Sequence, residues 1–339
     1  KIGKMNFGGT IRLNRMGICI IIGACVLLVL YINASGIESP KIEPVKNSDT
    51  VSMRNILVAA IKVAEEGGKE IVKVRKEPDI GEKIQGKTEE GVNDPVTRAD
   101  YNSHCVMYYN LKRSFPKAKI ISEHTRKESD CTNLSKLGDG VELNPNPPDQ
   151  LVPSEDVTIW IDPLDATKEF TENLLQYVTT MVCVAVKGEP IIGVIHKPFE
   201  TEPQTFWAWS GNSHSNNLKH KDGTATGTRI IVSISHAGSV KNISEQAFGK
   251  DVEVTAGAGA GYKSLMVASG EQDAYIHTTA IKKWDICAGN AIINSLGGRM
   301  TTLTNETIDY SSSDAVNKKG LLATVKNHQW YLDKLKMYV

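Results

Sequence analysis

The segment Trp160-Ile-Asp-Pro-Leu-Asp-Ala-Thr-Lys-Glu-Phe170 carries the most structural information in this chain. The apolar run that leads into it predicts a buried strand. That strand ends in two aspartates, Asp162 and Asp165, with Pro163 setting a bend between them and a hydroxyl following at Thr167. Two carboxylates this close repel each other unless a cation neutralises them, and oxygen ligands of this kind suit Mg²⁺. The segment therefore predicts a divalent-cation site with chemistry on a phosphate ester.

Three further acidic residues stand where they can join this pair. Glu123 follows a predicted strand at 119–122, whereas Asp100 and Asp285 each stand at the start of a predicted helix. Taken alone, each has a structural alternative. Glu123 is then a solvated carboxylate, Asp285 an N-cap and Asp100 an acid in a first helical turn. The aspartate pair is likewise open to reading as a turn with an N-cap. The combination of all five acids is what favours a metal site.

Length and charge restrict the class of protein. A chain of 339 residues exceeds one modest core, which predicts one large domain or two intimately packed ones. Its 39 basic and 39 acidic residues cancel, and no basic block is long enough to follow a nucleic-acid polymer. Predicted helices and strands alternate without a strict βαβ order, which indicates layered sheets with helices between and around them.

Several elements are predicted from local patterns. Apolar residues at helical spacing predict a helix at 51–76 that is broken near Gly67-Gly68. The charged segment 77–93 is predicted to be a loop or hairpin. Apolar runs at 178–186 and 191–196 predict a hairpin. Trp207 and Trp209 are predicted to lie in a hydrophobic layer.

The N-terminus predicts a membrane anchor. Residues 16–32 are apolar and uncharged, at the lower length limit for a membrane-spanning helix, and four basic residues precede them. A cleaved signal peptide processed near 33–36 is the alternative. The predicted organisation is a cytosolic tail at 1–15, a signal-anchor at 16–32, a stalk at 33–50 and a luminal domain at 51–339, whose metal-binding half covers about 51–200 and whose second half covers about 201–339.

Sequons and cysteines agree with exposure to a lumen. Four Asn-x-Ser/Thr sequons are candidate glycosylation sites, at Asn33, Asn133, Asn242 and Asn305. Four cysteines follow the apolar run, at Cys105, Cys131, Cys183 and Cys287. Four cysteines allow three full pairings, and the sequence does not choose among them. No C-x-x-C occurs, which argues against a zinc site or a thioredoxin-like motif.

The order and spacing of these features resemble the inositol monophosphatase family of Mg²⁺-dependent, lithium-sensitive phosphatases, over residues 51–339. The matching motifs are a strand-borne Glu123, Trp160 to Thr167, and Trp284 to Gly289. The resemblance implies a layered α-β-α-β-α sandwich, a small phosphate ester as substrate and a homodimer.

One departure from the family pattern narrows the resemblance. Ala166 stands where most members carry glycine. Together with Asp94-Pro-Val-Thr-Arg-Ala-Asp100, it resembles the branch that hydrolyses the 3'-phosphate of adenosine 3',5'-bisphosphate to AMP. Members of that branch are single-pass type II proteins of the Golgi membrane that support sulfation. The alternatives are an inositol monophosphatase, an inositol polyphosphate 1-phosphatase, or a membrane-anchored glycoprotein that binds without catalysis.

The resemblance also implies residue roles. Two Mg²⁺ ions would activate water for in-line attack without a covalent enzyme intermediate. Thr167, hydrogen-bonded to Asp100, would orient and deprotonate that water. The implied ligands are Glu123, Asp162 and the Leu164 carbonyl for the first ion; Asp162, Asp165 and Asp285 for the second; and Asp100 with Glu123 for a third, weaker one.

Two segments of the sequence are predicted to bind the substrate. Ser235 and His236 end a predicted strand and resemble the Ser-His segment that contacts the nucleotide in relatives. The glycines of 257–261, among them Gly259 and Gly261, precede a predicted helix that carries Lys263. Backbone N–H groups at such a helix start, with the lysine, would receive the second phosphate. A flexible loop is the alternative.

Overall fold

The computed structural model describes residues 49–87, 91, 93–131, 143–221, 227–234 and 237–338. The predicted tail and apolar run lie outside these ranges, as does all of the predicted stalk except its last two residues.

The fold prediction is corrected in one respect, the transmembrane helix. Across the described part of the chain, no helix is long and apolar enough to cross a membrane. The longest of the helices given there, α2 (Met53–Arg75), carries charged side chains such as Lys62 and Glu66. Residues 16–32, where the membrane helix was predicted, lie outside the described ranges. Over the described residues, the chain therefore forms a layered α/β fold.

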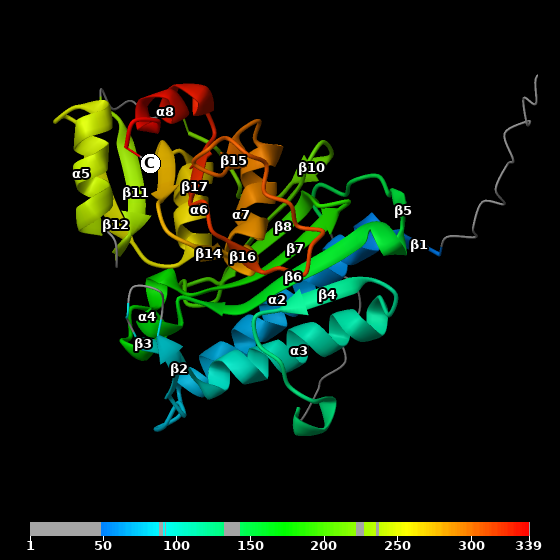
Figure 1. Cartoon of the computed structure of the whole chain (residues 1–339). Helices are drawn as coiled ribbons and strands as arrows, with labels where there is room; N and C mark the ends of the chain where they lie inside the picture. The colour runs from blue at the N-terminus through cyan, green and yellow to red at the C-terminus, as the bar shows by residue number, and fades with distance from the viewer. Residues whose placement is uncertain are drawn as a thin grey trace, which may run out of the picture. The chain divides into compact units, whose positions relative to one another are not determined.

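Five layers of secondary structure form the domain (Figure 1). Helices α2 and α3 (Arg98–Ser114) cover one face of a six-stranded sheet. Helices α6 (Ala260–Ser269) and α7 (Lys283–Ser295) separate that sheet from a five-stranded one. Helices α5 (Ala237–Phe248) and α8 (His328–Leu335) cover the outer face of the second sheet. This order matches the predicted α-β-α-β-α sandwich.

The six-stranded sheet has the order β10-β9-β8-β7-β6-β4. Only its β4–β6 pair is parallel. The predicted hairpin is confirmed as β7 and β8. The strands are β4 (Lys119–Ser122), β6 (Val157–Asp165), β7 (Thr179–Val186), β8 (Glu189–Lys197), β9 (Gln204–Trp209) and β10 (Ser213–His214).

The five-stranded sheet has the order β12-β11-β13-β17-β15. Its β11 strand runs parallel to both neighbours, and its other pairs are antiparallel. The strands are β11 (Arg229–Ser233), β12 (Glu253–Gly257), β13 (Ala274–His277), β15 (Arg299–Thr301) and β17 (Leu321–Thr324).

Short elements connect these layers. Among them, β2 and β3 form a hairpin that begins in the predicted charged segment 77–93 and extends beyond it to Val96. The remaining strand pairs are β1 (Thr50–Ser52) with β5 (Leu151–Pro153), β2 (Lys83–Lys87) with β3 (Asn93–Val96), and β14 (Ile281–Lys282) with β16 (Val316–Asn317); the remaining helices are α4 (Thr167–Thr171), η1 (Glu128–Asp130), η2 (Ser154–Asp156) and η3 (Leu175–Tyr177).

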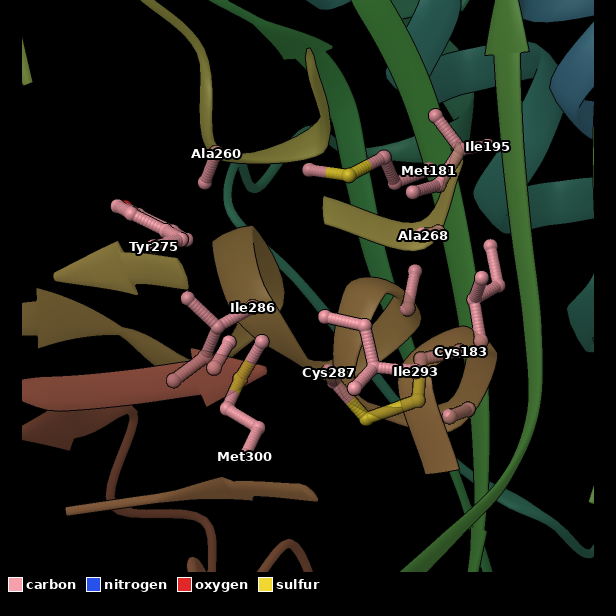
Figure 2. Close-up of a cluster of buried hydrophobic side chains, with 14 of the residues drawn as sticks. Met181, Cys183, Ile195, Ala260, Ala268, Tyr275, Ile286, Cys287, Ile293 and Met300 are labelled. Carbon is pink, nitrogen blue, oxygen red and sulfur yellow. A yellow bond between two sulfur atoms is a disulfide. The ribbon is translucent and has the colours of Figure 1, made fainter. Parts of the chain in front are cut away.

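Apolar side chains fill the space on both faces of the six-stranded sheet. Trp207 and Trp209 are buried against α2, as predicted. On the other face, Figure 2 shows the cluster between the sheet and α7, in which a disulfide joins Cys183 to Cys287. A second disulfide joins Cys105 of α3 to Cys131. The structure thus selects one of the three pairings that the sequence left open.

The predicted break in the first helix is wrong. Helix α2 runs without interruption through Gly67 and Gly68. A Cβ atom at Gly67 would lie 2.6 Å from Ser103 Oγ, and one at Gly68 would lie 2.6 Å from the His196 ring. These glycines therefore allow α3 and β8 to approach the helix closely, and burial of its apolar face offsets their low helix propensity.

The start of helix α7 also differs from prediction. Lys282 is the N-cap, and Asp285 lies in the first turn rather than at the cap. The carboxylate of Asp285 accepts a hydrogen bond from the backbone N–H of Lys282. It thus satisfies one of the unpaired N–H groups at the helix start from inside the helix.

Candidate active site

Most of the predicted site residues line one cavity of about 300 Å³. Asp100 and Gly261 lie next to it through hydrogen bonds to residues of its wall. Ser235 and His236 lie outside the described residues, so their prediction remains untested. The predicted residues in the wall are Glu123, Asp162, Leu164, Asp165, Thr167, Gly259, Lys263 and Asp285.

A β-bulge brings Asp162 and Asp165 to the same cavity. Residues three apart on a regular strand point to opposite faces of the sheet. Here Asp162 pairs with Met181 and Asp165 with Thr179, so three steps along β6 match two along β7. The extra residue re-aims the strand end, as bulges next to active sites do. The backbone N–H of Leu164 donates to Asp162 Oδ1 (3.1 Å), which holds the bend.

The parallel pairing of β4 with β6 places Glu123 beside Asp162. Ser122 lies opposite Ile161, and the backbone N–H of Glu123 donates to the Ile161 carbonyl (3.1 Å). The two carboxyl groups are close enough to share a hydrogen bond. A strand at the sheet edge thus delivers the third carboxylate to the aspartate pair.

The carboxylate of Asp165 accepts hydrogen bonds from backbone N–H groups at the start of helix α6. Backbone N–H groups donate to its carboxylate from Ala260 (3.1 Å) and Gly261 (2.8 Å). A Cβ atom would lie 2.8 Å from the Tyr177 carbonyl at Gly259 and 2.4 Å from Thr179 Oγ1 at Gly261. Glycine at both positions therefore lets the helix start reach the acid. These two amides, which were predicted to receive a phosphate, donate to Asp165 in the structure.

Thr167 and Asp100 form the predicted hydrogen bond. Thr167 Oγ1 lies 2.9 Å from Asp100 Oδ1 and 3.1 Å from the Leu164 carbonyl oxygen. Asp100 Oδ2 accepts hydrogen bonds from the backbone N–H and the hydroxyl of Thr97, both at 2.7 Å. A capping box at the start of α3 thus fixes Asp100 in place.

Burial raises the pKa values of Glu123, Asp162, Asp165 and Asp285. Burial raises the pKa of Glu123 to about 7. Burial also raises the pKa values of Asp162 and Asp285 well above their ordinary range, and neighbouring carboxylates raise them further. Asp165 also has a raised pKa because of burial, although Lys263 and the α6 amides oppose this. Burial lowers the pKa of Lys263 to about 8. Clustered carboxylates of this kind are typical of cation sites.

The donor set fits Mg²⁺, which binds carboxylate and carbonyl oxygens. The four predicted carboxylate ligands, Glu123, Asp162, Asp165 and Asp285, line the cavity together with Leu164. Within the described residues, no three acidic, histidine or cysteine side chains enclose a metal position as they stand.

Sequence reasoning missed several residues of the site. Asp94 of β3, Glu169 of α4 and Ser233 of β11 line the cavity. His124 lies 3.6 Å from both Asp100 and Glu123. Asp94 and Glu169 each belong to a motif quoted from the sequence, and His124 directly follows Glu123, so their neighbourhood in the chain was the available indication. Ser233 is brought to the cavity by tertiary packing.

Similarity to known proteins agrees with this geometry. The inositol monophosphatase family model matches residues 52–338. The putative inositol monophosphatase 3 of Drosophila melanogaster is 46% identical over 99% of this chain and 96% of its own length. The Golgi-resident adenosine 3',5'-bisphosphate 3'-phosphatase of Mus musculus is 42% identical over 96% of both chains. The crystal structure of CysQ from Bacteroides thetaiotaomicron, a bacterial member of the inositol monophosphatase family, superposes with a TM-score of 0.60 at 19% identity, covering 81% of this chain and 99% of that one. This chain belongs to the inositol monophosphatase family and is a phosphoric monoester hydrolase.

Proposed function

We propose that the protein hydrolyses the 3'-phosphate of adenosine 3',5'-bisphosphate, giving AMP and phosphate, with Mg²⁺ as cofactor. The observation that carries the proposal is the convergence of Glu123, Asp162, Asp165 and Asp285 on one cavity that also contains Lys263. An acidic cluster alone repels a phosphate ester, whereas the same cluster with bound cations and a lysine attracts one. Relatives named for this activity are similar to the chain over nearly its full length.

The residues that would hold the ions follow from the donor set. Glu123, Asp162 and the Leu164 carbonyl would hold one Mg²⁺, and Asp162, Asp165 and Asp285 the other, with Asp162 shared between them. The bound ions would supply Lewis-acid stabilisation of the phosphoryl group and of the departing 3'-oxygen.

The chain's own residues position the attacking water and its proton. The Thr167 hydroxyl donates to Asp100, so its lone pairs are free to accept a hydrogen bond from a water in the cavity. Asp100 Oδ2 is held by Thr97, which keeps the acceptor fixed while the proton moves through the hydroxyl. This arrangement corresponds to general-base assistance, which contributes about 10²–10⁴-fold to rate.

Lys263 is the proposed contact for the second phosphate of the substrate. Its Nζ atom donates to the Gly259 carbonyl (2.8 Å), and its side chain is buried against the Tyr275 ring. Burial disfavours this ammonium and the neighbouring acids offset only part of that cost, since its pKa is still lowered; an incoming phosphate dianion would stabilise it further. Ser235 and His236 remain the proposed nucleotide contacts.

Two features support a secretory-pathway location. Stable disulfides are typical of oxidising compartments, and the structure has Cys105–Cys131 and Cys183–Cys287. Of the four sequons, Asn242 and Asn305 are exposed, whereas Asn33 and Asn133 lie outside the described residues. The proposal therefore places the domain in the Golgi lumen, where the reaction would remove a product of sulfation. Endoglycosidase treatment and immunofluorescence of the expressed chain test this location.

The inositol esters are the competing substrates, because other relatives carry the name inositol monophosphatase 3. Phosphate release from adenosine 3',5'-bisphosphate and from inositol 1-phosphate, each with Mg²⁺ present, decides between them. A preference for the nucleotide supports the proposal, and a preference for the inositol ester overturns its substrate while leaving the catalytic residues in place. Lithium should inhibit whichever reaction occurs. Light scattering tests the homodimer implied by the family resemblance.

A further inference from the structure

A second pocket, of about 590 Å³, is lined by one face of helix α2 and by residues of β8, β9 and the turn between them. None of its lining residues belongs to the wall of the active-site cavity. Its volume lies within the range of about 300–1,000 Å³ that is usual for small-molecule sites. The function proposed above gives this α2 pocket no role.

One stripe of α2 forms the first wall of the α2 pocket. Its lining residues recur three or four positions apart, which places them on one face of the helix. Val72 contributes apolar surface, and three exposed lysines, Lys69, Lys73 and Lys76, follow the same face. Lysine side chains lay their aliphatic stems along apolar surface and keep their charge in water. This wall therefore combines apolar surface with a positively charged rim.

The wall opposite is apolar and fixed in shape. Pro198 and Pro203 stand at the two ends of the turn between β8 and β9, and both line the α2 pocket. Proline restricts its backbone φ and has no N–H group to donate. This part of the wall therefore presents apolar surface to an occupant.

A chain of hydrogen bonds completes the lining. The His196 side chain is buried, and its Nδ1 atom lies 2.9 Å from Thr205 Oγ1. The Thr205 hydroxyl donates to Glu65 Oε1 (2.7 Å). Because its one hydrogen goes to the carboxylate, which only accepts, His196 Nδ1 must donate to Thr205. Burial lowers the pKa of His196 to about 4, so the ring is neutral near pH 7. The acid in the wall is thus already engaged, and the histidine beside it carries no charge.

The lysine charges at the rim are available to an anion. Lys69 lies 2.6 Å from Glu66 and Lys73 lies 3.7 Å from Glu70, and both lysines are more than half exposed. Exposed ion pairs of this kind contribute little, so an incoming anion can compete for the lysines. Neither Glu66 nor Glu70 belongs to the pocket lining.

We propose that the α2 pocket binds an amphipathic organic anion, a small molecule with an apolar body and one acidic group. The apolar body packs against Val72 and the two prolines, and the acidic group faces the lysine rim. The pocket is thus a second ligand site, separate from the carboxylate cavity. This proposal does not depend on the function proposed for that cavity.

Fluorescence titration with anilinonaphthalene sulfonate tests the site, because this dye has an apolar aromatic body and one sulfonate. N-phenylnaphthylamine, which has the same aromatic body without the sulfonate, is the uncharged comparison. Lys69→Glu should weaken binding of the sulfonate about tenfold, the scale for reversing one exposed charge near an anion, and leave binding of the uncharged dye unchanged. Val72→Trp fills the pocket and should weaken binding of both dyes at least about tenfold.

Lys241→Glu is the matched control. Lys241 is an exposed lysine on helix α5 with Glu245 of the same helix 3.9 Å away, so its reversal should leave both affinities unchanged. Melting temperatures show which variants are folded, and Lys69→Glu, a surface change, decides the test if Val72→Trp unfolds. Absence of saturable sulfonate binding in the wild type, or equal affinity in Lys69→Glu and Lys241→Glu, would overturn the proposal. Dye binding that disappears as light scattering detects a dimer would mean that a second copy fills the pocket, which would also overturn it.

Discussion

Thr167 Oγ1 lies 2.9 Å from Asp100 Oδ1, although the two residues are 67 positions apart in the chain. One residue belongs to the first turn of α4 and the other to the first turn of α3. Two helix starts therefore meet at the edge of the carboxylate cluster. The orientation of the Thr167 hydroxyl, which is proposed to position the attacking water, depends on this contact between the two helix starts.

Replacing Thr167 tests that role. Thr167→Val keeps the shape and removes the hydroxyl, so kcat should fall about 10²–10⁴-fold. Thr167→Ser keeps the hydroxyl and should retain most of the activity. Thr171→Val is the control, because its hydroxyl donates only to the Lys168 carbonyl nearby. Steady-state phosphate release measures all three, and a fully active Thr167→Val would refute the assignment.

Asp162→Asn should separate activity from stability. Asp162 is the acid proposed to be shared by both ions, so turnover should fall at least about 10²-fold, the scale for losing one preorganised electrostatic group. Without divalent ions, the variant should melt no lower than the wild type, because it lacks one of several repelling buried carboxylates. Asp156→Asn, in the 3₁₀ turn η2 just before the same strand, should leave activity unchanged. Thermal melts in EDTA test the expected stability, and phosphate-release assays in Mg²⁺ test the expected loss of turnover.

Ala166→Gly should stabilise the protein. Ala166 has φ of +69°, in the left-handed region. That conformation costs a residue with a side chain about 1–2 kcal/mol, and the greater freedom of glycine in the unfolded chain offsets part of the gain. The free energy of unfolding in urea should rise by up to about 1 kcal/mol. Ala59→Gly, within helix α2, should instead lower it by about 1 kcal/mol.

The two disulfides should contribute unequally to the free energy of unfolding. Cys183–Cys287 closes 104 positions, and Cys105–Cys131 closes 26. The loop-entropy model gives about 5 kcal/mol for the longer loop and about 3.5 for the shorter one. Replacing both cysteines of a pair with alanine should therefore destabilise the protein more at Cys183–Cys287, which is also more deeply buried. Urea unfolding of the two double variants tests the order, and mass spectrometry confirms the remaining bond.

His328 should make the fold sensitive to acid. Its ring nitrogens are paired with Thr301 Oγ1 (2.9 Å) and Thr324 Oγ1 (3.0 Å), and burial lowers its pKa to about 4. A depressed pKa contributes stability above pH 6.5, and that stability is lost as pH falls from 6.5 to about 4. The loss amounts to about 3 kcal/mol at 1.36 kcal/mol per pKa unit.

A non-titrating variant isolates this effect. His328→Asn should be less stable than the wild type at pH 7.5, and the difference should shrink as the pH approaches 4. The control His214→Asn should follow the wild type throughout. Urea unfolding at several pH values gives the comparison, and a constant difference between wild type and His328→Asn would argue against the linkage.

The sequence by itself determined the identity of the acids and the elements that carry them. Glu123 and the aspartate pair were predicted from apolar runs that end in carboxylates, because a strand pattern is local and needs no tertiary information. The hairpin of β7 and β8 and the buried Trp207 and Trp209 followed from the same kind of pattern. The mix of predicted helices and strands indicated layered sheets, and the family resemblance added the α-β-α-β-α order of the layers.

Tertiary structure decided how these parts meet. The bulge that turns Asp162 and Asp165 toward one cavity depends on the register with β7, which no local pattern contains. The helix through Gly67 and Gly68 was predicted to break because isolated propensity cannot include the partner that packs against it.

The disulfide pairing and the position of His124 are also decided by tertiary packing. Cysteine spacing allowed three pairings, and only the packing of α7 on β7 brings Cys183 to Cys287. His124 carried no recognisable motif in the sequence, yet the fold aims its nitrogen between Asp100 and Glu123. Local sequence specifies which groups are available, whereas contacts between distant segments specify which of them act together, because those contacts depend on the packing of whole layers.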